Sequence, residues 1–226
     1  MAKKTYIGVN NVARQVKKVY IGVNGVARKV KKIYIGVANI ARQIFGGGEL
    51  SYYGIATSLS EARGDLAATS VGNYALFGGG SDLSTVDAYN TSLTRTSPTA
   101  LSKARSILAA TSVGNYALFG GGSSSSGSSS TVDAYNTSLT RTSPTALSKA
   151  RSSLAATSVG NYALFGGGSD LSTVDAYDTS LTRTSPTALS EARSSLAATS
   201  VGNYALFGGG FPSSGSISTV DVYTVA

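Results

Sequence analysis

The chain has 226 residues, of which 42% are hydrophobic, and its formal net charge is +8. That length and apolar content are sufficient for one repeat domain with a core and a small additional module. The absence of cysteine and histidine excludes disulfides, thiol nucleophiles, the usual zinc ligand sets and every histidine-dependent catalytic triad.

The positive charge is confined to the first part of the chain. Residues 1–48 contain ten lysines and arginines and no acidic residue, whereas residues 49–226 contain nine basic and eleven acidic residues, a net charge of −2. We therefore divide the chain into a basic arm, residues 1–48, and a nearly neutral body, residues 49–226. Neither an apolar run of about 18 residues nor a signal-peptide pattern is present, so we predict no membrane span and no leader.

The basic arm consists of three copies of a 14-residue unit, at residues 3–16, 17–30 and 31–44. Each copy reads Tyr-Ile-Gly-Val, two turn residues, and then Val-Ala-Arg or Ile-Ala-Arg. The Asn24-Gly25 pair of the second copy is a strong hairpin signal, because a type I′ turn needs positive φ at both central positions. We expect three short hairpins, or a meander in which the lysine pairs lie at the opposite bends.

Hairpins of this size are too small and too charged to bury a core alone, so they need a partner surface. We expect the arm to serve in docking or oligomerisation, with a solvated lysine-rich linker as the alternative. Nucleic acid is not the expected partner, because no reading motif accompanies the charges. The candidate docking residues are Lys17, Lys18, Tyr20, Arg28, Lys31, Lys32 and Tyr34.

Four near-copies of one segment fill the body. The signature Val-Gly-Asn-Tyr-Ala-Leu-Phe-Gly-Gly-Gly begins at Val71, Val113, Val159 and Val201, at spacings of 42, 46 and 42 residues. Each copy is preceded by Leu-Ser-(Glu/Lys)-Ala-Arg and followed by Ser-Thr-Val-Asp-(Ala/Val)-Tyr. A period of about 40–50 residues in an all-β pattern is typical of a propeller or a related repeat array.

The first copy predicts four strands separated by turns. The glycines before residue 81 end the second strand, and Pro98 stops the fourth because proline donates no ladder hydrogen bond. Four strands in each repeat match the blade of a propeller. The predicted strands are Leu66–Val71, Tyr74–Gly79, Thr85–Asn90 and Leu93–Ser97.

The propeller is expected to close through the beginning of the body. The last copy reaches Ala226 just after its third strand, and residues 50–57 hold the position of an outer strand ahead of the first copy. We predict that this N-terminal strand pairs into the blade of residues 196–224, because closure removes open sheet edges. An open arc, or closure through another chain, is the alternative.

The body resembles the kelch repeat family, whose propellers are related to the central domain of galactose oxidase. The residues that carry the resemblance are Arg63, Leu66, Tyr74, Gly78-Gly79 and the Val86–Tyr89 segment, repeated three more times. The resemblance covers about residues 59–226 and implies an all-β, kelch-like β-propeller of four repeats. Kelch repeats usually carry a tryptophan after the Val-x-x-Tyr strand, where this chain has Leu-Thr-Arg-Thr, so blade packing differs in detail. A generic β-solenoid is the alternative.

We expect no enzymatic activity and no cofactor. A copper site like that of galactose oxidase needs histidine ligands and a cysteine-linked tyrosine, and the chain has neither residue type. Aspartates recur once per repeat at the same strand position, at Asp87, Asp133, Asp175 and Asp221. An active site normally breaks repeat symmetry, so this recurrence predicts a structural hydrogen bond, to a neighbouring strand or to the repeated arginine.

The copies differ most in the loops that follow the glycines. Their lengths alternate between four and eight residues, at 81–84, 123–130, 169–172 and 211–218. Varied loops on near-identical strands are typical of a binding face, although drift in a duplicated gene gives the same pattern. Asp82 and Asp170 are predicted to cap turns rather than to bind calcium, and Phe211-Pro212 is predicted to be an exposed apolar tip. The candidate binding residues are Ser81, Asp82, Ser123, Ser126, Gly127, Ser169, Asp170, Phe211 and Pro212.

The repeats of residues 3–44 resemble the N-terminal repeats of structural proteins encoded by phages and prophages of Gram-positive bacteria. The resemblance rests on the tandem Lys-Lys-x-Tyr-Ile-Gly-Val-x-x-Val-Ala-Arg units. It implies a virion component of the tail or a surface fibre, with the arm docked on virion or tail proteins and the propeller binding a host-surface glycan or protein. The alternatives are a cytoplasmic kelch-type interaction scaffold and a virion decoration protein without a ligand. We expect the virion protein to form homo-oligomers.

Overall fold

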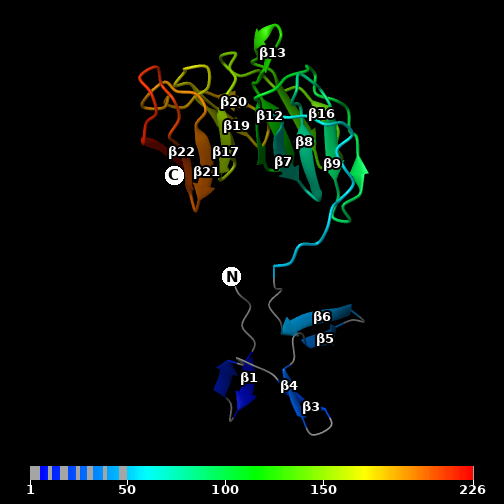
Figure 1. Ribbon diagram of the computed structural model, residues 1–226. Helices are drawn as coiled ribbons and strands as arrows, with labels where there is room; N and C mark the ends of the chain where they lie inside the picture. The colour runs from blue at the N-terminus through cyan, green and yellow to red at the C-terminus, as the bar shows by residue number, and fades with distance from the viewer. Residues whose placement is uncertain are drawn as a thin grey trace. The chain divides into compact units, whose positions relative to one another are not determined.

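The computed structural model describes residues 50–225 and, before them, the backbone of the strands between Tyr6 and Phe45. The chain divides into two compact units, Met1–Gly54 and Ile55–Ala226, which Figure 1 shows. All regular secondary structure in the described residues is β-strand. The searched residues accordingly contain no helix of the length and apolarity that crossing a membrane requires.

The arm contains three separate two-stranded antiparallel sheets, which confirms the hairpins and not the meander. In the second hairpin Val23 pairs with Val26, so two residues separate the strands, as in a tight hairpin turn. Those turn residues lie outside the described residues. The strands are β1 (Tyr6–Val9), β2 (Val12–Gln15), β3 (Tyr20–Val23), β4 (Val26–Lys29), β5 (Ile33–Val37) and β6 (Ile40–Phe45).

Of the candidate docking residues in the arm, three lie on described strands: Tyr20 on β3, Arg28 on β4 and Tyr34 on β5. The four lysines, Lys17, Lys18, Lys31 and Lys32, lie outside the described residues. The docking role of the arm therefore stays a prediction.

Each repeat of the body folds into its own antiparallel sheet, and no sheet closes on itself. The first sheet contains β7 (Ala67–Val71), β8 (Tyr74–Gly78), β9 (Val86–Tyr89) and β10 (Arg95–Thr96). The second contains β11 (Ala109–Val113), β12 (Tyr116–Gly120), β15 (Val132–Asn136) and β16 (Arg141–Thr142). The third contains β17 (Ala155–Val159), β18 (Tyr162–Gly166), β19 (Val174–Asp178) and β20 (Arg183–Thr184). The fourth has three strands, β21 (Ala197–Val201), β22 (Tyr204–Gly208) and β23 (Val220–Thr224). A further small hairpin joins β13 (Ser123–Ser124) to β14 (Gly127–Ser128) in the second repeat's loop.

The strand pattern follows from period-2 burial and a two-residue turn. Along β11, Ala109, Thr111 and Val113 are buried while the residues between them are partly exposed. Val113 pairs with Tyr116 across a turn in which Gly114 has a φ of 52°. The four predicted strands of the first copy are thus confirmed, with the fourth shortened to two residues.

Three apolar clusters join the sheets in sequence, first to second, second to third, and third to fourth. Figure 1 shows the sheets following one another along an arc, with the first and fourth at its ends. At each interface the rear face of one sheet meets the front face of the next. The front face contributes a phenylalanine ring that lies on a glycine of the sheet before it. A Cβ added to Gly120 would lie 2.7 Å from the ring of Phe165, so no larger residue fits there.

The predicted closure of the propeller by residues 50–57 is wrong. These residues form no strand, β23 has no partner beyond β22, and no apolar cluster among residues 50–225 joins the fourth sheet to the first. The carbonyl of Thr57 instead accepts a hydrogen bond from the hydroxyl of Tyr89, at 2.7 Å, so Thr57 lies beside the first sheet. The described body is an open arc, which was the alternative.

Substituting an interface glycine tests how tightly the sheets pack. We expect Gly120→Ala to destabilise the fold by about 1–3 kcal/mol, because the added methyl overlaps the ring of Phe165. Gly64→Ala is the matched control, since no atom lies within 4 Å of a Cβ added there. Chemical denaturation of both variants measures the difference, and equal midpoints would contradict the packing argument.

Candidate binding loops and the repeated polar network

A buried ion-pair network recurs in every sheet, and its centre is the repeated aspartate. Asp133 accepts hydrogen bonds from Arg105 at 2.9 Å, from Arg141 at 2.8 Å and from the backbone N–H of Ser102 at 3.1 Å. The side chains of Arg105 and Asp133 are completely buried. Arg105 also donates to the carbonyl of Phe119 at 3.2 Å. The predicted structural role of the aspartate is therefore confirmed.

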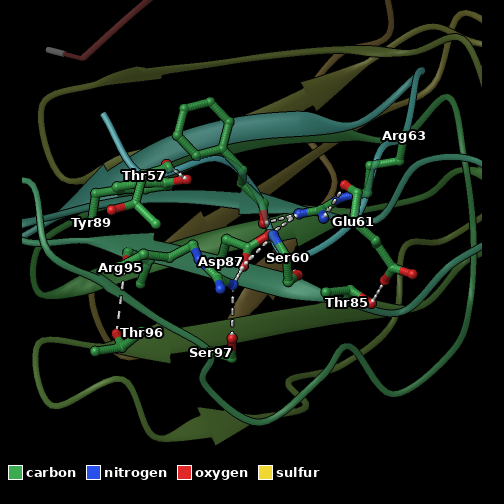
Figure 2. A network of polar contacts seen from close by, with 12 residues as sticks. Thr57, Ser60, Glu61, Arg63, Thr85, Asp87, Tyr89, Arg95, Thr96 and Ser97 are labelled. Atoms are coloured by element: carbon green, nitrogen blue, oxygen red, sulfur yellow. Dashed lines mark hydrogen bonds and ion pairs between the residues drawn. The ribbon is translucent and has the colours of Figure 1, made fainter. Parts of the chain in front are cut away.

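Figure 2 shows the same network in the first repeat, where Asp87 receives hydrogen bonds from Arg63, Arg95 and Ser60. Burial by itself would raise the pKa of the Asp87 carboxyl. The hydrogen bonds from Arg95, Arg63 and Ser60 outweigh that effect and hold its pKa below the ordinary value. The carboxylate is thus charged, paired and fully engaged at neutral pH.

The arginines of the second, third and fourth networks also join two sheets. The Arg105 side chain enters the second sheet, whereas its backbone N–H donates to Leu83 at 3.1 Å and its carbonyl accepts from Gly80 at 2.9 Å in the first sheet's loop. Arg151 and Arg193 make the same pair of backbone bonds to the second and third loops. The polar network thus connects neighbouring sheets, and each of its four carboxylates is paired with arginine.

The four variable loops form one row, because neighbouring loops share partners. Ser106 exchanges backbone hydrogen bonds with Ser123 at 2.8 Å, and its hydroxyl donates to Asp82 at 2.6 Å. In the same way Ser194 bridges Asp170, at 3.1 Å, to the backbone of Phe211. The hydroxyls of Ser128 and Ser169 lie 3.4 Å apart and connect the second loop to the third.

The two short loops share one turn. Ser81 and Asp82 both have positive φ, near 50°, and the N–H of Leu83 donates to Gly80 across them at 2.9 Å. Ser169 and Asp170 repeat these angles. Asp82 and Asp170 each accept a hydrogen bond from a serine outside their turn, Ser106 and Ser194 respectively, so the predicted turn-capping role stays a prediction. The residues that the structure describes contain no group of three acidic side chains able to hold a metal ion.

The two long loops differ from each other. The loop of residues 123–130 folds into the β13–β14 hairpin, with Ser126 and Gly127 exposed at its tip and Ser123 half-buried at its base. In the loop of residues 211–218 the ring of Phe211 is exposed, as predicted, but Pro212 is buried and is not part of an exposed tip. Phe211, beside Pro212, forms an isolated β-bridge with the distant Ser194, a long-range contact that the local sequence does not predict.

Sequence reasoning missed the serines that join the loops. Ser106 and Ser194 lie in the link between repeats, directly after the buried arginine, and were not candidates. The sequence does contain a pattern that could have identified them, because a serine follows the link arginine in the last three copies, as Ser152 does after Arg151. The carbonyl of Ser152 likewise accepts a hydrogen bond from the backbone N–H of Ser169 in the neighbouring loop, at 3.0 Å.

A groove of about 340 Å³ lies between the third and fourth sheets. Tyr162 and Pro186 line one side, and Tyr223 and Val225 line the other. At the equivalent place between earlier sheets, Leu139 and Leu181 fill the space from the turn before an outer strand. No leucine of the described residues fills the equivalent space between the third and fourth sheets, so the groove is open there.

No protein family and no curated protein matches this chain. Among solved structures, the chain is similar to the one titled "Structure of YjhT", a kelch-type propeller, with a TM-score of 0.62 and 11% sequence identity. The match covers 76% of this chain and 67% of that one. Repeated four-stranded sheets and this neighbour are consistent with a kelch-like repeat fold. A similarity at so low an identity shows the fold alone.

The ion-pair network gives a large expected effect on stability. We expect Asp133→Ala to lower the free energy of unfolding by about 3–5 kcal/mol, because it leaves the fully buried Arg105 without its counter-charge. Glu191→Ala is the control, since Glu191 makes no ion pair among the described residues, and a change within about 0.5 kcal/mol is expected. Urea denaturation followed by circular dichroism compares the two, and a similarly small loss in Asp133→Ala would contradict the network.

The buried tyrosines predict loss of stability in alkali. Burial, with the nearby Asp221 carboxylate, raises the pKa of Tyr223 to about 12, and its hydroxyl donates to the carbonyl of Thr187 at 2.8 Å. Burial also raises the pKa of Tyr135 and Tyr177. Because the folded state holds these protons more tightly, the stabilisation is complete below pH 10 and is lost as pH rises towards 12.

Denaturation midpoints measured between pH 8 and 12 test this dependence. Tyr177→Phe removes one buried phenol, so we expect a lower midpoint at neutral pH and a shallower decline above pH 10 than in the unsubstituted chain. An unchanged slope would show that these phenols do not govern the alkaline transition.

Proposed function

We propose that this chain is a non-enzymatic structural protein of a phage particle, in the tail or a surface fibre. Its basic arm docks on the particle, and its variable loops bind a host-surface glycan or protein. The observation that carries the proposal is the row of exposed loops, which differ in length and sequence while the sheets that hold them are nearly identical. Loops positioned by a rigid scaffold are a common site of recognition.

The chemistry of the loops favours a glycan. Ser81, Asp82, Ser126 and Asp170 present hydroxyl and carboxylate groups to solvent, and these groups match the hydroxyls of a sugar. Phe211 adds an exposed aromatic ring, which offers an apolar surface beside these polar groups. The shared serine partners hold neighbouring loops together, so a ligand longer than one sugar would contact more than one loop.

A non-catalytic role is supported by where the acidic residues are used. The aspartates of the four sheets are paired with arginine, and Asp82 and Asp170 each accept a hydrogen bond from a serine in the following link, Ser106 or Ser194. The docking role of the arm rests on its ten basic residues and its resemblance to phage structural repeats. The intracellular scaffold and the decoration protein without ligand remain the competing functions.

Replacing the long loop of the second repeat tests the binding role. We expect substitution of residues 123–130 by the Ser-Asp-Leu-Ser of residues 81–84 to reduce binding of the labelled full chain to intact Gram-positive cells by about tenfold, because the exposed hairpin is removed. The first and third repeats already fold with this short loop, so unfolding midpoints should stay the same.

The matched control is Glu191→Ala, which lies outside the variable loops, makes no ion pair among the described residues, and should bind as the unsubstituted chain does. Full binding by the shortened loop variant and by Phe211→Ser would contradict the binding role of the loops. Failure of the full chain to co-purify with phage particles would favour the intracellular scaffold.

A further inference from the structure

The two ends of the arc expose the two halves of an interface that the body builds three times. In the first three sheets the rear face is buried by the next sheet, as the 3% exposure of Val113 illustrates. In the fourth sheet the equivalent Val201 is 65% exposed. At the other end, Phe119, Phe165 and Phe207 are completely buried, whereas the equivalent Phe77 of the first sheet is partly exposed.

The exposed residues are the same residue types, at the same repeat positions, as the buried ones. The rear face of the fourth sheet is not covered by a following sheet; it comprises Ala197, Val201, Leu206, Gly208, Val220 and Val222. The front face of the first sheet is not covered by a preceding sheet; it comprises Ala75, Phe77 and Tyr89. Val222 is the single departure, since the other copies carry alanine there.

We infer that the rear face of one copy of this chain binds the front face of a second copy, head to tail. The occupant of the rear face is thus the first sheet of another molecule, seated as the second sheet is seated on the first. Continuity with the three internal interfaces carries this inference, because each of them joins the same two surfaces.

The backbone supports the same docking. Each internal interface has three hydrogen bonds between a link and the preceding loop: Leu101 N–H to Ser84, Arg105 N–H to Leu83, and Gly80 N–H to Arg105. At the two ends, the equivalent pairs are the Leu59 N–H with the Ser218 carbonyl, the Arg63 N–H with the Ile217 carbonyl, and the Gly210 N–H with the Arg63 carbonyl. None of these pairs forms among residues 50–225, and docking of a second copy brings all three together.

The missing strand of the fourth sheet is explained as well. Thr57 holds the repeat position of Thr99, Thr145 and Thr187, each of which follows the outer strand of the preceding sheet. A docked copy therefore leads its residues 50–56 past the free edge of β23 and the groove beside Tyr223. That segment carries Leu50, Tyr52, Tyr53 and Ile55, which are all at least 83% exposed.

Closure within one chain would need the fourth sheet to meet the first, and no apolar cluster among residues 50–225 joins these two sheets. Binding of a second copy buries both faces of both molecules.

Disulfide trapping in this cysteine-free chain tests the docking. A Cβ on Gly72 lies 3.5 Å from the Cβ of Thr137 across the first internal interface, within the range for a disulfide. The equivalent pair between two copies is Gly202 and Thr91. We expect an oxidised mixture of full-length Gly202→Cys and Thr91→Cys to give a covalent dimer on the order of tenfold more abundant than either variant alone, because docking raises the local thiol concentration.

The Gly72→Cys/Thr137→Cys variant is the positive control and should form an intrachain disulfide. No mixed dimer, with this control oxidised, would overturn the inference. An intrachain disulfide in Gly202→Cys/Thr91→Cys, with no covalent dimer, would overturn it too and show closure within one chain.

Gly208→Ala distinguishes docking from chance collision of thiols. A Cβ at Gly208 meets only a side-chain carbon of Val220, at 3.5 Å, so the folded chain should accept it with an unchanged unfolding midpoint. At the internal position Gly166 the same Cβ lies 2.7 Å from the ring of Phe207. We expect Gly208→Ala to reduce trapping roughly tenfold, because it obstructs Phe77 of the second copy. Undiminished trapping would overturn the proposed seating.

Discussion

The body depends on one interaction, the buried pair between a link arginine and a strand aspartate. A buried guanidinium is costly unless it is paired with an opposite charge, and Arg105 reaches both Asp133 and the Phe119 carbonyl only when the second sheet is correctly placed. Its own backbone is held by the first sheet's loop. The pair therefore specifies where each sheet lies relative to the one before it, in addition to joining strands within a sheet.

This constraint separates conserved from variable parts within the repeats. Residues that touch the arginine link or the neighbouring sheet recur in all four copies, such as Gly78 against the ring of Phe119. The loops touch each other mainly through serine hydroxyls and backbone groups, which tolerate changes in length. One repeat thus accepts a four-residue turn and the next a β-hairpin on the same sheet edge, and the loops vary without disturbing the core.

The strands and the arginine–aspartate pairing were predictable, because both follow from local patterns and exact recurrence. The geometry of the whole was not. The position of residues 50–57 ahead of the first copy suggested a closed ring, but curvature depends on the angle between neighbouring sheets, and no residue of a single repeat reveals that angle. The burial of Pro212 was likewise not predicted, since its neighbour Phe211 is held by a bridge to the distant Ser194, which the local sequence does not reveal. The serines after the link arginine were visible in the sequence, yet their partners became apparent only once the loops lay side by side.

A repeat array has a further physical consequence at its ends. Each internal interface hides apolar residues of two sheets, so an array of identical repeats leaves one such surface exposed at each end unless the terminal repeats change character. Here the first and fourth sheets keep the internal sequence almost unchanged: Phe77 still faces outward, and Val201 and Val220 are still valines. Terminal repeats that face solvent usually acquire polar residues. The retention of the interface residues at both ends therefore argues that these surfaces are covered in the working protein, and the surface best matched to each is the other.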